Sequence, residues 1–167
     1  MEITRLLRAW SDGDQDAFDA IAADGRYILH IDWNAPDYTS IVSSIRKLKQ
    51  CSGLAINWKA LKKLALWLDE QERMAGEYWS ISFVKMVALV LGRYGIEVFL
   101  IRDSSDSDWA AITLLPRGNI HLVKKLFRRL FGDLGITWCV ASAVGWDSPG
   151  EVRKELQRRL VSIVSEP

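Results

Sequence analysis

Cysteine, histidine and proline are scarce in this chain. Its 167 residues include two cysteines, Cys51 and Cys139, two histidines and four prolines. Two cysteines so far apart exclude a disulfide framework and a paired-cysteine zinc site, so we interpret both as core thiols. A chain of this length buries about 70% of its unfolded surface, and it therefore needs neither a disulfide nor a metal ion to fold.

Long apolar runs and an excess of one charge are also missing. Runs such as Val87–Leu91 are far shorter than a membrane span. Lys plus Arg number 22 against 21 for Asp plus Glu, a balance that argues against a nucleic-acid coat protein. The N-terminus is acidic and lacks the basic-then-apolar layout of a secretory signal. We therefore expect a cytoplasmic protein without a membrane partner.

Motifs that mark catalytic sites are absent from the sequence. It contains no glycine-rich phosphate loop, dinucleotide fingerprint, nucleophile elbow, zincin helix or paired CxxC. His30 and Asp32 lie two residues apart in a predicted strand, where a carboxylate on the same face can orient an imidazole base. We interpret them as a hydrogen-bonded pair at the sheet edge, with an enzyme built on them as an open hypothesis. We expect binding rather than catalysis, with no cofactor, no metal ion and no small-molecule substrate.

The hydropathy pattern predicts an α+β fold, with a mainly antiparallel sheet of three or four strands covered by helices. We expect one domain over residues 1–167, in which residues 1–25 form a helical hairpin, an appendage in front of the sheet. The stretch 81–91 carries one charge, Lys85, and is predicted to be the central buried helix. Helix caps are predicted at Ser11, Asn57, Asn119 and Ser148, and strands at Tyr27–Trp33, Ile96–Ile101, Trp109–Leu115 and Ile136–Val140.

The two strands between residues 96 and 115 predict a β-hairpin with an acidic tip. Asp103, Asp106 and Asp108 lie in this turn, and Trp109 follows them. Calcium loops of the EF-hand type need a glutamate at loop position twelve, counted from the first ligand as position one. With Asp103 or Asp106 as the first ligand, Leu114 or Arg117 occupies that position. The tip is therefore either a solvated turn or an acidic contact loop. Because indole rings beside charges suit interface hot spots, we place Asp103, Asp106, Asp108 and Trp109 on a partner-binding surface.

Two predicted helices, 119–131 and 149–164, carry strongly basic outer faces. The basic residues are Lys124, Lys125, Arg128 and Arg129 on the first helix and Arg153, Lys154, Arg158 and Arg159 on the second. Two such faces bind nucleic-acid phosphates if they lie side by side in the fold. A nucleic-acid-binding regulator is therefore the alternative to a protein-binding function.

The segment GIEVFLIRDSSDSDWAAITLLP, Gly95–Pro116, resembles small uncharacterised bacterial α+β domains. Some of those domains serve as immunity proteins against polymorphic or contact-dependent toxins. The resemblance implies a protein that neutralises a cognate bacterial toxin, such as a nuclease, by occluding its active site. In that case the acidic tip mimics phosphates and meets the basic cleft of the toxin.

Overall fold

The computed structural model describes residues 2–23, 26–32, 36–103, 109–131 and 136–165. Within them the chain forms seven α-helices, two short 3-10 helices and one antiparallel sheet of four strands, which confirms the predicted fold class. In chain order the elements are α1 (Glu2–Ser11), α2 (Gln15–Ala22), β1 (Ile28–Asp32), α3 (Tyr38–Lys47), η1 (Lys49–Cys51), α4 (Trp58–Ala75), α5 (Ser80–Gly92), β2 (Ile96–Asp103), β3 (Trp109–Pro116), α6 (Ile120–Phe131), β4 (Ile136–Val140), η2 (Ala141–Ala143) and α7 (Gly150–Ser165).

The sheet has the strand order β1-β3-β2-β4, so the predicted β2–β3 hairpin forms its centre. Leu100 of β2 lies opposite Ile112 of β3 and opposite Cys139 of β4. Neighbouring residues in β2 point to opposite faces, yet Phe99 and Leu100 are both buried. Helices therefore cover both faces of the sheet, and this explains why the central strands are continuously apolar rather than alternating.

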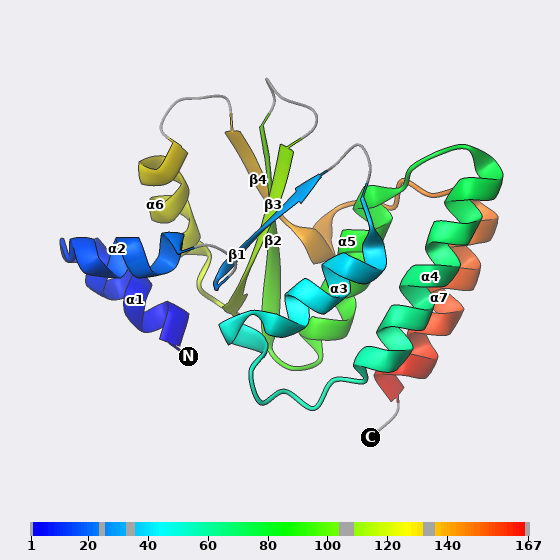
Figure 1. The fold of residues 1–167 in the computed structure, drawn as a ribbon, viewed down its shortest axis with the longest axis horizontal. Helices are drawn as coiled ribbons and strands as arrows, with labels where there is room; N and C mark the ends of the chain where they lie inside the picture. Colours follow the sequence, from blue (N-terminus) through cyan, green and yellow to red (C-terminus); the bar gives the residue numbers. More distant parts are fainter. Residues whose placement is uncertain (1, 24–25, 33–35, 104–108, 132–135, 166–167) are drawn as a thin grey trace.

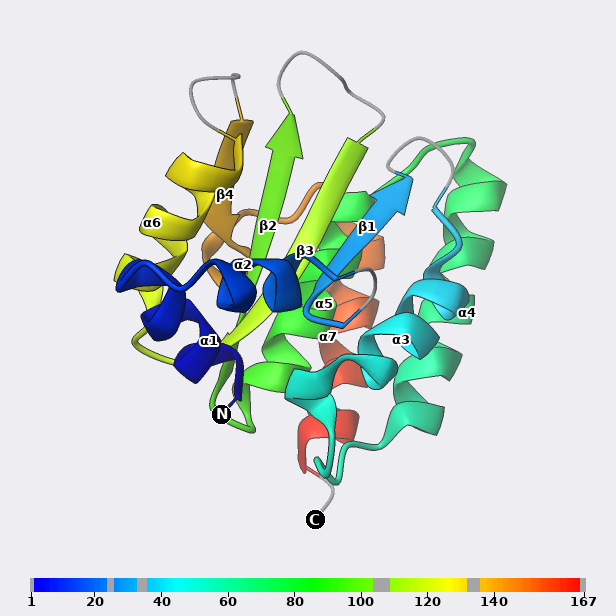
Figure 2. The ribbon, with the colours of Figure 1, turned by 60° about the vertical axis from the view of Figure 1, so that its left-hand side comes forward.

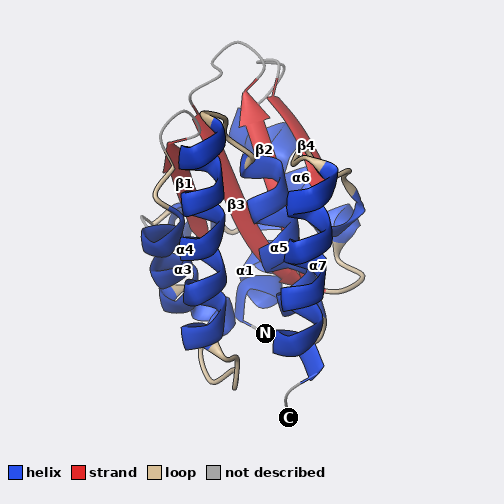
Figure 3. Cartoon of the chain, turned by 90° about the vertical axis from the view of Figure 1, so that its right-hand side faces the viewer, coloured by secondary structure: helices blue, strands red, loops and turns tan. Residues whose placement is uncertain are grey.

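The helices form one layer on each side of the sheet (Figures 1 and 2). On one side α3, α4, α5 and α7 share a core with residues of the sheet such as Val98 and Leu100. On the other side α1, α2 and the start of α6 pack on Phe99 and Ile101. The Trp10 and Phe18 rings, 5.6 Å apart, join α1 to α2. Figure 3 shows α4 and α7 side by side on the outside of the larger layer.

Helix α5 is the central buried helix that the sequence predicts. Nine of its thirteen residues are buried. The ammonium of Lys85, its single charged side chain, donates to the carbonyl of Val144 and lies 5.2 Å from the ring centroid of Trp146. The charge thus reaches the edge of the layer, and the rest of the helix remains in the core. None of the described helices is long and apolar enough to cross a membrane.

Two of the predicted helix caps are wrong. Asp14, not Ser11, caps α2 and accepts hydrogen bonds from the backbone N–H of Asp16 and Ala17, because Gly13 turns the chain with a φ of 102° directly before it. Ser148 does not form the predicted capping box; its hydroxyl accepts a hydrogen bond from Ser82 Oγ over 2.9 Å.

The predicted cap at Asn57 is confirmed, since its side chain accepts from the backbone N–H of Ala60 at 3.0 Å. This cap fixes the start of α4.

Candidate binding surfaces

Two of the predicted partner-binding residues, Asp103 and Trp109, lie at one end of the sheet. β2 ends at Asp103 and β3 begins at Trp109, while Asp106 and Asp108 lie outside the described residues. The strand register sets Asp103 opposite Ile136 and Trp109 opposite Asp32. The backbone thus brings the ends of four strands together at the place where the hairpin turns.

The His30–Asp32 pair lies on β1, an edge strand of the sheet. Both residues are exposed, although they share one face of β1 with the buried Ile28. Their exposure places them at the surface rather than in an enclosed pocket.

Both cysteines have the inert environment predicted for core thiols. Cys51 is buried in the larger core, and burial raises the pKa of its thiol to about 12. Cys139 is half-buried, and burial raises its pKa as well. Neither thiol is a thiolate at neutral pH, the form that attacks substrates or binds metals. Within the described ranges, no group of three or more His, Cys, Asp and Glu side chains is placed to hold a metal ion.

The two basic helices do not form one surface. α6 packs on the face of the sheet that carries Phe99, whereas α7 packs with α4 and α5 on the other face (Figure 1). The sheet therefore separates the exposed Lys124, Lys125 and Arg128 from Arg158 and Arg159. A nucleic acid gripped by both helices at once, as the alternative function requires, does not fit this arrangement.

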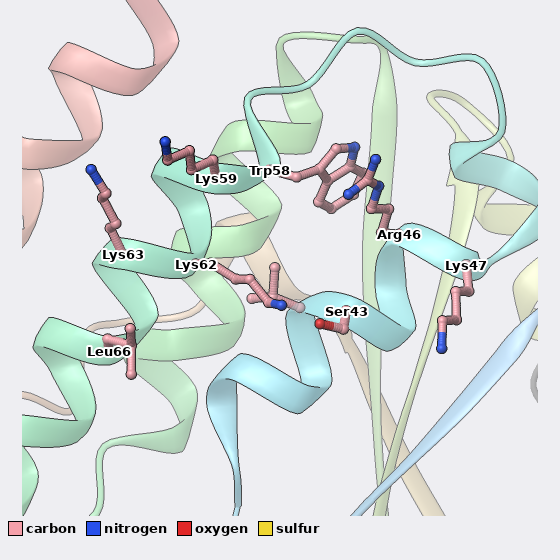
Figure 4. Close-up of a pocket in the computed structure, with 9 residues that line it drawn as sticks. Ser43, Arg46, Lys47, Trp58, Lys59, Lys62, Lys63 and Leu66 are labelled. Carbon is pink, nitrogen blue, oxygen red and sulfur yellow. The ribbon is translucent and has the colours of Figure 1, made fainter.

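A basic groove that the sequence did not predict lies between α3 and α4 (Figure 4). Its volume is about 690 Å³. We call it the α3–α4 groove; its lining residues are Val42, Ser43, Arg46, Lys47, Trp58, Lys59, Lys62, Lys63 and Leu66. Five of these nine side chains are cationic and none is acidic.

The amphipathic pattern of the two helices builds this groove. In α4, Leu61, Leu64 and Leu68 face the core, so Lys59, Lys62, Lys63 and Leu66 occupy the outer stripe at helical spacing. In α3, the inward positions are Ile41, Val42 and Ile45, which leaves Arg46 and Lys47 outside at the end of the helix. Trp58, 9% exposed, wedges between the helices at the start of α4 and forms part of the apolar floor.

The cations of the groove lack acidic partners in the described part of the chain. The ion pairs found there involve Arg158 and Arg159, each with Glu155, and none involves the five cations of the groove. The N-terminal end of α4, where the helix dipole is positive, adds to the same field beside Lys59 and Lys62. The groove is therefore a positive region whose cations form no ion pairs among the described residues, and this favours an anion.

A smaller depression of about 330 Å³ lies on the other side of α4, against α7. We call it the α4–α7 depression; it is lined by Ala60, Lys63, Leu64, Arg158, Arg159, Ser162 and Ile163. Lys63 lines both this depression and the α3–α4 groove. The two hollows are thus neighbours on one side of the molecule.

Comparison with known proteins adds no assignment to these surfaces. No protein-family model matches the chain, and searches of the curated proteins and of the solved structures find no significant match. The function must therefore be inferred from the chain's own sequence and geometry.

Proposed function

We propose that this chain is a protein-binding protein, and that its α3–α4 groove receives an acidic segment of the partner. One observation carries the proposal: five cations without acidic partners surround an apolar floor formed by Val42, Trp58 and Leu66. Charged residues around an apolar centre are the usual anatomy of a protein interface. The positive charge selects an acidic partner and speeds the encounter, and the floor supplies the buried contact.

A protein segment fits the groove better than a nucleic acid does. Leu66 is 57% exposed at the end of the basic stripe, and an exposed aliphatic side chain favours an apolar group of a partner over a phosphate. The basic stripe from Lys59 to Leu66 is about 10 Å long, because a helix rises 1.5 Å per residue. Asp69 and Glu70 line the next hollow along α4 and would repel a polyanion that continued there.

Fluorescence anisotropy with short labelled peptides tests this function. The probe is a Gly/Ser-based peptide that carries three Glu and one Leu, and its counterpart carries Lys in place of Glu. The acidic peptide should bind, the basic one should not, and added salt should weaken binding because exposed charges are screened. Tighter binding of oligo(dT) than of the acidic peptide, or no peptide binding at millimolar concentration, would contradict the proposal.

A matched pair of variants locates the interaction. Lys59→Glu/Lys62→Glu should weaken binding of the acidic peptide by about tenfold or more, equivalent to ~1.4 kcal/mol. Lys124→Glu/Arg128→Glu changes the net charge equally but lies on α6, across the sheet. If both variants lose the same affinity, net charge rather than the groove determines binding, and the site is wrong.

A toxin-neutralising role is the biological form of this function that we propose from the sequence resemblance. The protein would act in the cytoplasm by covering the active site of a cognate toxin, without making or breaking bonds itself. Two surfaces of opposite charge are available for this role. The α3–α4 groove suits an acidic region of the toxin, and the hairpin end, with Asp103, Asp106, Asp108 and Trp109, suits a basic cleft.

Co-expression with the products of neighbouring open reading frames tests this role. The wild-type chain should restore growth to cells that a neighbouring product inhibits. Loss of protection in Asp103→Lys/Asp106→Lys/Asp108→Lys alone would assign the contact to the hairpin end, and loss in Lys59→Glu/Lys62→Glu alone would assign it to the groove. If no neighbouring product inhibits growth, the toxin-neutralising role is wrong, and the peptide-binding test still stands.

A further inference from the structure

Lys63 connects two basic hollows that lie on either side of α4. On one side it lines the α3–α4 groove, and on the other it lines the α4–α7 depression with Arg158, Arg159 and Ser162. In Figure 4 its side chain lies on the side of α4 nearer to α7. A ligand that enters the groove therefore meets cations again as soon as it crosses the helix.

The arginines of the depression are held in place before any ligand binds. Glu155 accepts hydrogen bonds from Arg158 Nε at 2.9 Å, from Arg158 Nη2 at 2.6 Å and from Arg159 Nε at 2.9 Å. The guanidinium of Arg159 also lies 4.7 Å from the ring centroid of Trp67 on α4. Cation–π contact and bidentate pairing fix long side chains that are otherwise mobile, so less conformational entropy is lost on binding.

Arg159 keeps capacity for a second anion. Its hydrogen bond to Glu155 uses Nε, and its side chain is 41% exposed, so the terminal nitrogens have room for another acceptor. Lys63 and Ser162 line the same hollow and add two further hydrogen-bond donors, one on a long side chain and one on a short side chain. One ammonium, one guanidinium and one hydroxyl together match the oxygens of a carboxylate.

We propose that the α4–α7 depression is a second anion-binding subsite, in which Lys63, Arg159 and Ser162 hold a carboxylate of the same acidic segment that occupies the α3–α4 groove. This inference rests on the proposed function and specifies the partner further. The segment of the partner crosses α4 beside Lys63 and carries two acidic side chains, one for each hollow.

The width of a helix sets the spacing of those two acidic residues. An α-helix with its side chains is about 10 Å across. An extended chain covers that distance in about three residues at roughly 3.3 Å each. The partner segment should therefore have acidic residues about three positions apart, with an apolar residue between them for the floor near Leu66.

Isothermal titration with three synthetic peptides tests the subsite. The first has two Glu three positions apart around a Leu, the second has adjacent Glu residues, and the third has one Glu. Wild-type protein should bind the first peptide about tenfold more tightly than either of the others. Arg159→Gln should remove this advantage and leave binding of the single-Glu peptide unchanged.

Two further variants make the result specific. Arg153→Gln removes an exposed arginine of α7 that does not line the depression, and it should leave all three affinities unchanged. Arg159→Lys keeps the charge and should retain part of the advantage. If Arg159→Gln, shown by circular dichroism to be folded, binds the first peptide as the wild type does, the subsite is wrong while the groove stands. If no peptide binds wild-type protein, the proposed function fails together with the subsite.

Discussion

The phenol of Tyr38 donates a hydrogen bond to Glu72 Oε2 over 2.9 Å, which joins the first turn of α3 to the end of α4. The same oxygen accepts from the backbone N–H of Trp79 at 2.9 Å, directly before α5. Glu72 is 4% exposed, so one buried carboxylate connects three helices of the larger layer. This contact helps to orient α3 against α4, and it therefore supports the groove between them.

Stability should depend on pH through Glu72. Burial raises its pKa and the carboxylates of Asp69 and Asp147 raise it further, although the hydrogen bonds from Trp79 and Tyr38 act in the opposite direction. Because the folded state holds this proton more tightly than the unfolded chain, the contribution of Glu72 to stability is greatest below its ordinary pKa of 4.5 and is lost as the pH rises through the folded value.

Glu72→Gln cannot titrate, so its free energy of unfolding relative to wild type should increase as the pH rises from about 4.5 towards neutrality. Urea unfolding at several pH values measures this difference, in which the other titrating groups largely cancel. A difference that stays constant with pH would contradict the raised pKa.

Removing the Tyr38 hydroxyl should destabilise the fold. Tyr38→Phe leaves the stacked contact with Phe83, whose ring centroid lies 4.2 Å away, but removes the hydrogen bond to Glu72. Loss of a buried bond to a carboxylate costs about 1–3 kcal/mol. Chemical denaturation measures this loss, and the double variant Tyr38→Phe/Glu72→Leu, compared with each single variant, provides the control. If the two single effects simply add, the bond contributes nothing of its own.

Asp147 should act as a helix cap supplied from a distant part of the chain. Its carboxylate accepts from the backbone N–H of Ile81 at 3.2 Å and of Ser82 at 2.8 Å, at the start of α5. Asp147→Ala should therefore lower the free energy of unfolding by about 1–2 kcal/mol, and Asp147→Asn by less. Glu151→Ala, in the first turn of α7, tests whether any nearby acid has the same effect. An equal loss in that variant would argue against a specific cap.

Periodicity and composition predicted most of the elements because each is encoded locally. The nearly uninterrupted apolar stretch around Lys85 identified the central helix, and the β-prone runs on either side of the acidic turn identified the central hairpin. The caps at Ser11 and Ser148 failed for two different reasons. Because the chain turns at Gly13, α2 begins directly after Asp14 rather than after Ser11. The hydroxyl of Ser148 instead accepts a hydrogen bond from Ser82, which is far away in the sequence.

The α3–α4 groove could not be predicted from local sequence patterns, although the positions of its lysines on one helix could. The sequence places Lys59, Lys62 and Lys63 on the outer face of one helix, but nothing in their spacing shows that Arg46 and Lys47 lie across from them. That depends on how α3 and α4 pack around Trp58, a tertiary contact. The acidic residues of the hairpin end, by contrast, remain a prediction from sequence.

The cations of the groove should reduce stability, as expected for residues kept for binding. Lys59 lies in the first turn of α4, where the helix dipole disfavours a cation. Lys62 and Lys63 lie three and four residues later, where like charges on a helix repel each other. Lys59→Glu should therefore raise the free energy of unfolding by about 0.5–1.5 kcal/mol, or the melting temperature by a few degrees, and more at low salt.

Thermal denaturation and peptide binding should then move in opposite directions for Lys59→Glu. The variant should melt at a higher temperature than wild type and bind the acidic peptide more weakly. Lys124→Glu on α6, away from a helix start, should change both properties little. A variant of Lys59 that loses stability as well as binding would show that the lysine supports the fold. The groove would then be a by-product of helix packing rather than a surface for a partner.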